Sequence, residues 1–314
     1  MLEIMKEKLY TSRSLKARIL LNWQVYLLAL PGLVVLIWFR YIPMWGLQIA
    51  FKEYNLLDGF WKSPWASPPW KYIEQLLNTP NFFQVLRNTL IINFYSLIFQ
   101  FPIPIIFALM MNECLQLRYK KIIQTVSYLP HFLSWVIIFN IFSNLLALNT
   151  GIVNQIIVFF GGKQKVFLTD PSIFRGILVT AGIWKSAGWG TIIILAAITA
   201  VNPDLHEAAL IDGAGKLQRI WHVTLACIKP TIVVLMILRT GAALSTDVEM
   251  VLQFYSPLVY ETGDVLGTYM FRRGIQNMQF SFITAAGFFT SVVNFLLLYI
   301  TDWAAKKMGE SGLW

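Results

Sequence analysis

The sequence predicts an all-α polytopic membrane protein with six transmembrane helices. Of its 314 residues, 57% are hydrophobic and only 13% are charged, which is outside the usual range for soluble globular domains. The apolar residues form runs long enough to cross a bilayer core, which takes about 20 helical residues. Basic residues are scattered between these runs and form no basic helix with interleaved aromatics. The net charge of +9 therefore does not indicate nucleic-acid binding.

Six apolar runs define the predicted spans. In chain order they cover residues 20–42, 86–111, 122–146, 176–200, 230–252 and 281–304. Pro102 and Pro104 interrupt the second run, and Pro130 introduces a bend in the third. Membrane helices tolerate such prolines as kinks. The kinks either have no function or allow the spans to splay around a transport path.

Both termini are expected on the cytoplasmic side of the plasma (inner) membrane. An even number of spans places them on one side, and short segments on that side are enriched in basic residues. These are Lys6, Lys8, Arg13, Lys16, Arg18, Arg118, Lys120, Lys121, Lys306 and Lys307. Cys114 and Cys227 also fall on this reducing side, so no structural disulfide is expected.

One membrane domain is the simplest partition, because the chain has no linker, low-complexity tract or fixed-period repeat. We expect a cytoplasmic tail at 1–19, a transmembrane domain at 20–305 and a cytoplasmic C-terminal tail at 306–314. Within the domain, the outer segment 43–85 is rich in tryptophan and proline and contains the amphipathic stretch WKYIEQLL. This stretch is either an interfacial helix with an aromatic belt or, in addition, a docking surface for a binding protein.

The cytoplasmic loop 201–229 contains the most informative local pattern. Asp204 is predicted to cap a helix of about two turns, and Glu207 to reach back to the same end as in a capping box. Gly213 and Gly215 are expected to end the helix. Small residues on this helix would let its backbone approach another protein closely. The candidate coupling residues are Glu207, Ala208, Ala209, Asp212, Gly213 and Ala214.

The segment EAALIDGAG, followed by IWHVTL and a proline at 230, resembles the EAA loop of ABC-importer permeases. The stretches YIPMWGLQIAFKEYN, LRNTLIINFYSLIFQFPIPIIFALMMNE, QTVSYLPHFLSWV, GIWKSAGWG and GESGLW resemble one branch of sugar-importer permeases. The family usually has proline directly after Thr-Leu, where this chain has Ala226.

The resemblance implies a type I ABC-importer permease fold and a short coupling helix that docks into the ATPase subunit. It implies import of oligosaccharides, often fragments of acidic polysaccharides. The implied partners are a second homologous permease, two ATPase subunits and an extracytoplasmic solute-binding protein. Closure of the ATPase dimer would pull the coupling helices together, so that the cavity alternates its opening.

Polar residues within the spans are candidates for a substrate pathway, because such residues are costly in a bilayer. In the fourth span, indole faces could stack on sugar rings and an ammonium could meet a uronate carboxylate, although helix packing and snorkelling also explain these residues. The charged residues of the fifth span either contact substrate or pair with one another or with a partner subunit. Four asparagines either contact sugar hydroxyls or form interhelical hydrogen bonds. The pathway candidates are Trp184, Lys185, Trp189, Asn93, Asn140, Asn144, Arg239, Asp247 and Glu249, with Asn294 as the fourth asparagine.

Catalytic machinery is not evident. His131, His206 and His222 have no metal-binding spacing, and no GxxxxGK[ST] phosphate loop occurs, so no cofactor or metal is expected. Energy for ATP-driven transport would have to come from a partner chain. The alternative is an ion-coupled secondary transporter of a small solute, which would need inverted repeats and a tuned intramembrane carboxylate such as Asp247. A membrane scaffold without transport is a third possibility.

Overall fold

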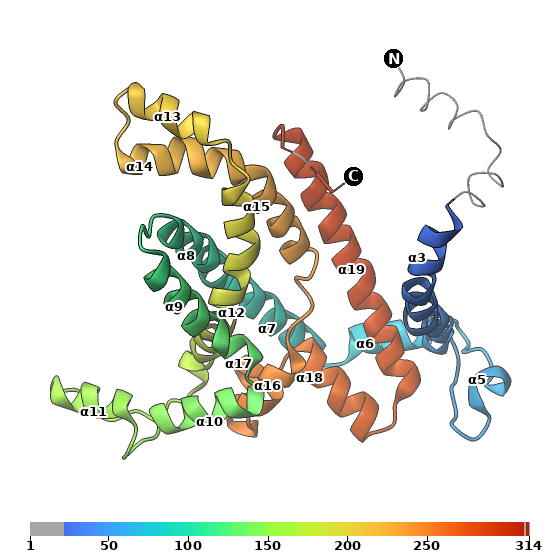
Figure 1. The fold of residues 1–314 in the computed structure, drawn as a ribbon. Coiled ribbons are helices and arrows are strands. Elements are labelled where there is room, and N and C mark those ends of the chain that lie inside the picture. Colours follow the sequence, from blue (N-terminus) through green and yellow to red (C-terminus); the bar gives the residue numbers. More distant parts are fainter. Residues whose placement is uncertain (1–21, 311, 314) are drawn as a thin grey trace.

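The computed structural model describes residues 22–310, 312 and 313, and these residues form helices and connecting loops without a β-sheet (Figure 1). The whole of the predicted tail 1–19 and two residues of the C-terminal tail lie outside the described residues. The longer helices are α3 (Trp23–Leu36), α7 (Phe82–Tyr95), α8 (Pro102–Asn112), α9 (Leu117–Tyr128), α10 (Trp135–Leu145), α12 (Pro171–Thr199), α15 (Leu225–Thr240) and α19 (Phe280–Lys307). The shorter helices are α4 (Ile42–Met44), α5 (Gly59–Lys62), α6 (Lys71–Asn78), α11 (Ile152–Phe159), α13 (Pro203–Ile211), α14 (Lys216–Arg219), α16 (Val248–Phe254), α17 (Tyr260–Gly263) and α18 (Leu266–Met270).

Five helical runs are individually long and apolar enough to cross a membrane. They are Trp23–Phe51, Phe82–Asn112, Pro171–Thr199, Lys216–Thr240 and Phe280–Lys307, with mean hydropathies between 1.4 and 2.0. A sixth crossing is obtained if α9 and α10 are taken together as one bent span. The number of spans thus agrees with the six predicted from the sequence, although three of their boundaries differ.

The first span extends beyond the predicted range 20–42, because its helical run ends at Phe51. The helix continues through α4 and a 3₁₀ segment to Phe51, so the predicted outer segment 43–85 begins inside a helix. This extension packs against α19, with the Phe51 ring 5.6 Å from that of Phe288. Tertiary packing therefore continues a helix that the hydropathy pattern alone does not extend.

The third predicted span, 122–146, is not one straight helix. α9 and α10 meet at an angle of 104°, because a 3₁₀ turn containing Pro130 is followed by extended backbone at Leu133. Ser134 then caps α10, accepting a hydrogen bond of 3.4 Å from the Ile137 amide. The proline that was expected to introduce a bend lies at a complete break.

The fifth predicted span, 230–252, is shifted along the chain. The helical run begins at Lys216 and ends at Thr240, and residues 241–247 form a loop. A side chain at Gly241 would meet Leu298 of α19 at 2.8 Å, and Asn294 of α19 accepts a hydrogen bond from the Leu244 amide at 2.9 Å. Contacts with α19 therefore hold the loop that follows Thr240.

α12 lies at the centre of the bundle. It packs against α8, α9, α15 and α17, and Phe174 and Leu178 of α12 are fully buried in the main hydrophobic cluster with Ile138 and Val251. α3, in contrast, stands apart from the bundle in Figure 1 and has no buried residue. In a membrane, its exposed apolar side chains require lipid or another protein as a neighbour.

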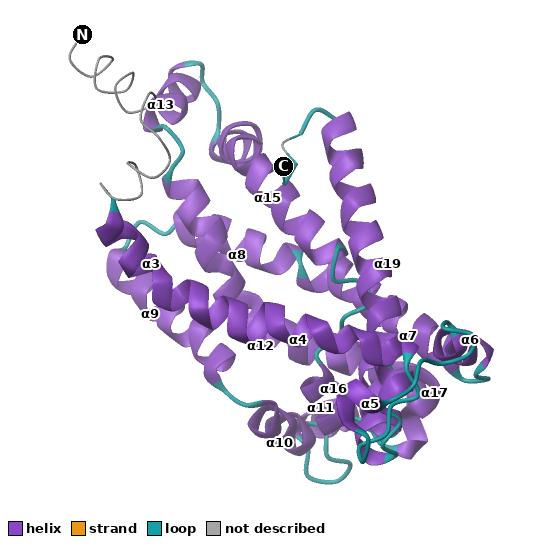
Figure 2. Cartoon of the chain, turned by 90° about the vertical axis from the view of Figure 1, so that its right-hand side faces the viewer, coloured by secondary structure: helices purple, strands orange, loops and turns teal. Residues whose placement is uncertain are grey.

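The ends of the spans define two faces of the molecule. Figures 1 and 2 show α13 and the C-terminal end of α19 at one end of the bundle. α6, α10 and α16 lie toward the opposite end in both views. The predicted coupling loop and the end of the last span therefore share one face.

Candidate functional site

The helix predicted in loop 201–229 is present as α13, but its start differs from the prediction. Asn202, not Asp204, is the N-cap: its Oδ1 accepts a hydrogen bond of 3.0 Å from the Asp204 amide. Pro203 occupies the first helical position, where its fixed φ fits and no amide is needed. Asp204 lies in the first turn, where a carboxylate is favoured by the helix dipole. Glu207 makes no capping hydrogen bond in the described structure.

The end of α13 is fixed by Gly213. This residue has a φ of +80°, a left-handed conformation that glycine adopts without a steric penalty. The Ala214 amide donates to the Ala209 carbonyl at 2.9 Å and the Gly213 amide to that of Leu210 at 3.0 Å, which is a Schellman ending. Gly215, which was also expected to end this helix, instead precedes α14 and donates to Gln218 Oε1 at 2.8 Å.

The surface of this region is unusually apolar for a segment outside the membrane. α13 has no buried residue, and Leu210, Ile211 and Leu217 are 58%, 86% and 80% exposed. Glu207 and Asp212 are exposed on the same short segment and form no ion pair within the described chain. An exposed apolar surface with free carboxylates is typical of a protein-docking site.

α13 is firmly connected to the transmembrane bundle. It packs against α14 and the π-helical segment Ile220–Thr224, and α14 continues through this segment into α15 without interruption. Lys216 also forms an ion pair of 3.0 Å with Glu113 at the end of α8. A displacement of α13 would therefore be passed to α15 and α8.

A second group of candidates surrounds a polar cavity of about 220 Å³ beside α12. Residues of α7, α12, α15, the break before α10 and the loop before α16 contribute to its wall. The polar and aromatic residues of the wall are Asn93, Ser96, Gln100, His131, Trp135, Lys185, Ser186, Arg239, Ser245, Thr246 and Asp247. Four sequence candidates, Asn93, Lys185, Arg239 and Asp247, are thus brought together.

Lys185 is bound by the break between α9 and α10. Its ammonium donates hydrogen bonds to the His131 carbonyl at 3.3 Å and to the Leu133 carbonyl. It also lies 4.9 Å from the ring centroid of Trp135, within range of a cation–π interaction. Trp189, one turn further along α12, stacks on the His131 ring with a centroid distance of 4.4 Å.

Asp247 is held by α10 and α16. It accepts a hydrogen bond of 2.6 Å from the Trp135 indole and one of 3.2 Å from the Met250 amide, so it caps α16. Asp247 and Glu249 were expected near the outer end of the fifth span, but both lie beyond the end of its helix. Neither forms an ion pair with Arg239 in the part of the chain that the structure describes.

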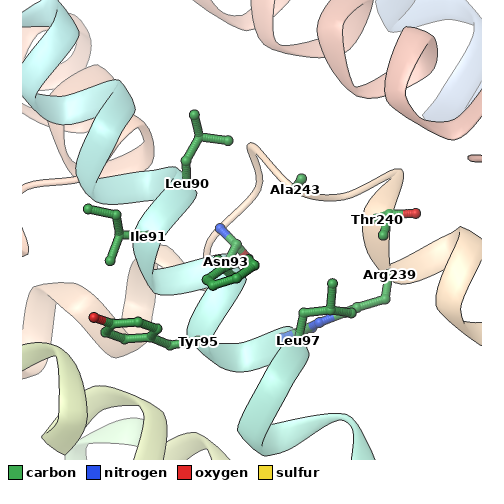
Figure 3. Close-up of a pocket in the computed structure, with 9 residues that line it drawn as sticks. Leu90, Ile91, Asn93, Tyr95, Leu97, Arg239, Thr240 and Ala243 are labelled. Carbon is green, nitrogen blue, oxygen red and sulfur yellow. The ribbon is translucent and has the colours of Figure 1, made fainter. Parts of the chain in front are cut away.

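Arg239 lies in the last turn of α15 at the meeting point of three cavities. It contributes to the wall of the polar cavity and to those of two neighbours of about 410 and 560 Å³. Figure 3 shows the largest of these between α7 and the end of α15, with Asn93 and Arg239 among its lining side chains. The guanidinium donates to Gln100 Oε1 at 3.3 Å.

The remaining candidates lie outside the polar cavity. Trp189 contributes to the 410 Å³ cavity, while Trp184 is 40% exposed with its ring 6.2 Å from that of Phe142. Asn140 and Asn144 are exposed on α10. Asn294 is explained by interhelical bonding, because it donates to Ser245 Oγ at 3.0 Å and accepts from the Leu244 amide.

Gln100 is a cavity residue that the sequence pattern did not single out. Its amide donates to Ser186 Oγ at 2.7 Å and to the Gly182 carbonyl at 3.2 Å, and its oxygen accepts from Arg239. It thereby joins α12 and α15 across the cavity. A polar residue two positions before Pro102 in an apolar run was the signal that could have identified it.

Metal-binding side chains do not cluster in the described part of the chain. No group of three or more histidine, cysteine, aspartate or glutamate side chains there could hold a metal ion. Cys114 and Cys227 are free thiols, the first half-buried and the second exposed.

Known proteins resemble this chain over nearly its whole length. Protein LplB of Bacillus subtilis is 43% identical over 92% of this chain and 90% of its own length. The polygalacturonan/rhamnogalacturonan transport system permease protein YteP of the same organism is 42% identical with the same coverage. A chain from the crystal structure of a bacterial alginate ABC transporter, in complex with an alginate pentasaccharide-bound periplasmic protein, superposes with a TM-score of 0.84. It is 38% identical over 96% of this chain and 100% of that chain.

These similarities confirm the predicted all-α ABC-importer permease fold. They favour an ABC-importer permease over the secondary transporter considered above. Residues 100–310 match the model of the family described as "binding-protein-dependent transport system inner membrane component". The chain is a multi-pass membrane protein and belongs to this family of permeases.

Proposed function

We propose that this permease forms half of the translocation pathway of an ATP-driven importer for oligosaccharides derived from an acidic, uronate-containing polysaccharide. The observation that carries the proposal is the 38% identity, over 96% of the chain, to a chain of the transporter crystallised with an alginate-bound periplasmic protein. The similarity to a polygalacturonan/rhamnogalacturonan permease supports the same substrate class. Alginate and polygalacturonan both consist of uronate units, so a carboxylate on each sugar is the shared chemistry.

α13 is the proposed site of energy transfer. The sequence lacks a phosphate-binding loop, so ATP hydrolysis is assigned to two ATPase subunits that receive α13 in a surface cleft. Exposed Leu210 and Ile211 supply the apolar contact, and Glu207 and Asp212 are free to meet basic residues of the partner. Closure of the ATPase dimer would displace α13, and the unbroken run from α14 into α15 would carry this displacement toward Arg239.

The remaining proposed partners are a second, homologous permease and an extracytoplasmic solute-binding protein. Exposed α3 and the two larger cavities, one between α7 and α15 and the other lined by α8, α12 and α15, leave apolar surface for the second permease. The Trp-rich segment between α3 and α7 belongs to the face opposite α13 and is available to the binding protein.

Transport assays on the complete complex test this function. The complete complex of permease pair, ATPase subunits and binding protein is reconstituted into liposomes. Uptake of labelled trigalacturonate and of a labelled alginate trisaccharide is then measured with and without ATP. Uptake is expected to require ATP at a constant ion gradient. Uptake that follows the ion gradient in the absence of ATP would contradict the proposal and support the secondary transporter.

Cysteine labelling tests the proposed cytoplasmic position of α13 and of both termini. A membrane-impermeant maleimide should leave Cys114 and Cys227 unmodified in intact cells. After the cells are opened, exposed Cys227 should react faster than half-buried Cys114. Modification of either residue in intact cells would reverse the orientation.

A further inference from the structure

The two cations of the polar cavity differ in how completely the chain satisfies them. An ammonium has three N–H donors, and Lys185 donates to two backbone carbonyls while lying over the Trp135 ring. The acceptors belong to the break between α9 and α10, where helical hydrogen bonding stops. Lys185 therefore satisfies backbone groups that the bend would otherwise leave unpaired.

Arg239 has most of its hydrogen-bonding capacity unused. A guanidinium presents five N–H donors in a planar fork, yet among the described residues Arg239 donates only to Gln100, at 3.3 Å. No carboxylate of the described chain forms an ion pair with it. Charged groups within membrane helices usually find a partner. Arg239 is exposed in the described chain, so its unused donors are accessible to an anionic group that comes from outside that chain.

Asp247 is not this anion, although it contributes to the wall of the same cavity. Its two oxygens are used by the Trp135 indole and the Met250 amide. These bonds hold Asp247 at the start of α16, away from ion-pair distance of Arg239. In the described chain, both oxygens of the Asp247 carboxylate thus have hydrogen-bond donors, whereas most donors of the Arg239 guanidinium have no acceptor.

The position of Arg239 favours a ligand that moves through the bundle. It is shared by the walls of all three cavities, so a group bound to the guanidinium would lie at their junction. His131 Nδ1 and Thr246 Oγ1 are buried in the described structure without a hydrogen-bond partner, and both residues belong to the polar cavity. A ligand with a carboxylate and several hydroxyl groups would satisfy all three side chains.

We infer that Arg239 determines specificity by binding the carboxylate of a uronate unit in transit, and that Lys185 is a positioning residue for the α9–α10 bend. This inference rests on the proposed function and names the residue that distinguishes acidic from neutral sugars. The guanidinium fork matches a carboxylate in two parallel hydrogen bonds, which a lysine ammonium does not.

A matched pair of substrates tests the division of roles. The complete complex in liposomes is supplied with labelled trigalacturonate or its methyl ester, which has the same sugar rings without the charge. Arg239→Gln should lower transport of the acid by about 10- to 100-fold, the loss expected for a charge-assisted contact. Transport of the ester should change by less than about threefold. Arg239→Lys should recover part of the transport of the acid because it retains the charge.

Lys185→Met is the control, because it removes the other cation of the same cavity. It should lower transport of acid and ester by the same factor, since it alters the bend and not a carboxylate contact. Equal losses of both substrates in Arg239→Gln, or unchanged transport of the acid, would overturn the inference. Loss of the second permease from the purified Arg239→Gln complex would also overturn it, because the missing anion would then belong to that subunit.

A second measurement covers the case in which the wild-type complex does not carry the ester. The complex is trapped with a non-hydrolysable ATP analogue, and retained trigalacturonate is counted. Arg239→Gln should retain about 10-fold less label than Lys185→Met, and equal retention would overturn the inference. A wild-type complex that carries no acidic oligosaccharide with ATP would instead contradict the proposed function itself.

Discussion

The proposed coupling helix α13 and the polar cavity differ in the sequence distance over which their residues find hydrogen-bond partners. Asn202 caps α13 through a residue two positions away, and the turn at Gly213 is closed by residues within five positions. In the cavity, the hydrogen bonds of Lys185 span 52 and 54 positions, and that of Arg239 spans 139. Local signals were therefore sufficient to locate the helix α13. The roles of the two cavity cations depend on contacts that no local pattern contains.

Replacement of Gly213 is expected to have the largest effect. Gly213→Val places a β-branched residue at a φ of +80°, which costs about 1–3 kcal/mol. No atom lies within 4 Å of the position of the added Cβ, so the cost is conformational. Uptake per ATP hydrolysed should fall at least about 10-fold while membrane insertion persists. Gly213→Asn is the control, because asparagine tolerates this conformation. Normal coupling in the valine variant would contradict the idea that coupled uptake depends on the left-handed turn at Gly213.

Removal of the Lys185 charge tests whether the long-range hydrogen bonds of the polar cavity stabilise the structure. In Lys185→Met, the His131 and Leu133 carbonyls lose their ammonium donor, and an unsatisfied buried acceptor costs about 1–3 kcal/mol. The Tm of the purified complex in detergent should fall by several degrees. The Tm of Lys185→Arg, which retains N–H donors, should fall less. A methionine variant as stable as the wild type would contradict the positioning role.

The smallest expected effect distinguishes the observed cap of α13 from the predicted one. Asn202→Ala removes the side chain that accepts from the Asp204 amide, a loss of about 1 kcal/mol. Asp204→Ala removes only a favourable charge at the helix start, worth about 0.3–1 kcal/mol. Coupled uptake should therefore fall several-fold in the first variant and less in the second. The reverse order would restore Asp204 as the functional cap.

The differences between the predicted and observed spans also arise from long-range contacts. Hydropathy located the apolar runs because about 20 apolar residues are needed to cross the bilayer. It did not reveal that the third run breaks by 104° or that the fifth ends at Thr240. The break is stabilised by Lys185 of α12, and the loop after Thr240 is stabilised by Asn294 of α19. A hydropathy window contains no information on such partners.

The sequence by itself determined the helical membrane class, the number of crossings and the position of α13, because hydrophobic run length and helix-end chemistry act over a few residues. The resemblance of its motifs identified the permease family. Only the tertiary structure decided that Lys185 is engaged with the α9–α10 break and that Asp247 caps α16. It also decided that Arg239, among the described residues, retains free donors at the junction of three cavities. The physical reason is that the hydrogen bonds of a polar group in a helical bundle depend on which helices pack around it, and these helices come from distant parts of the chain.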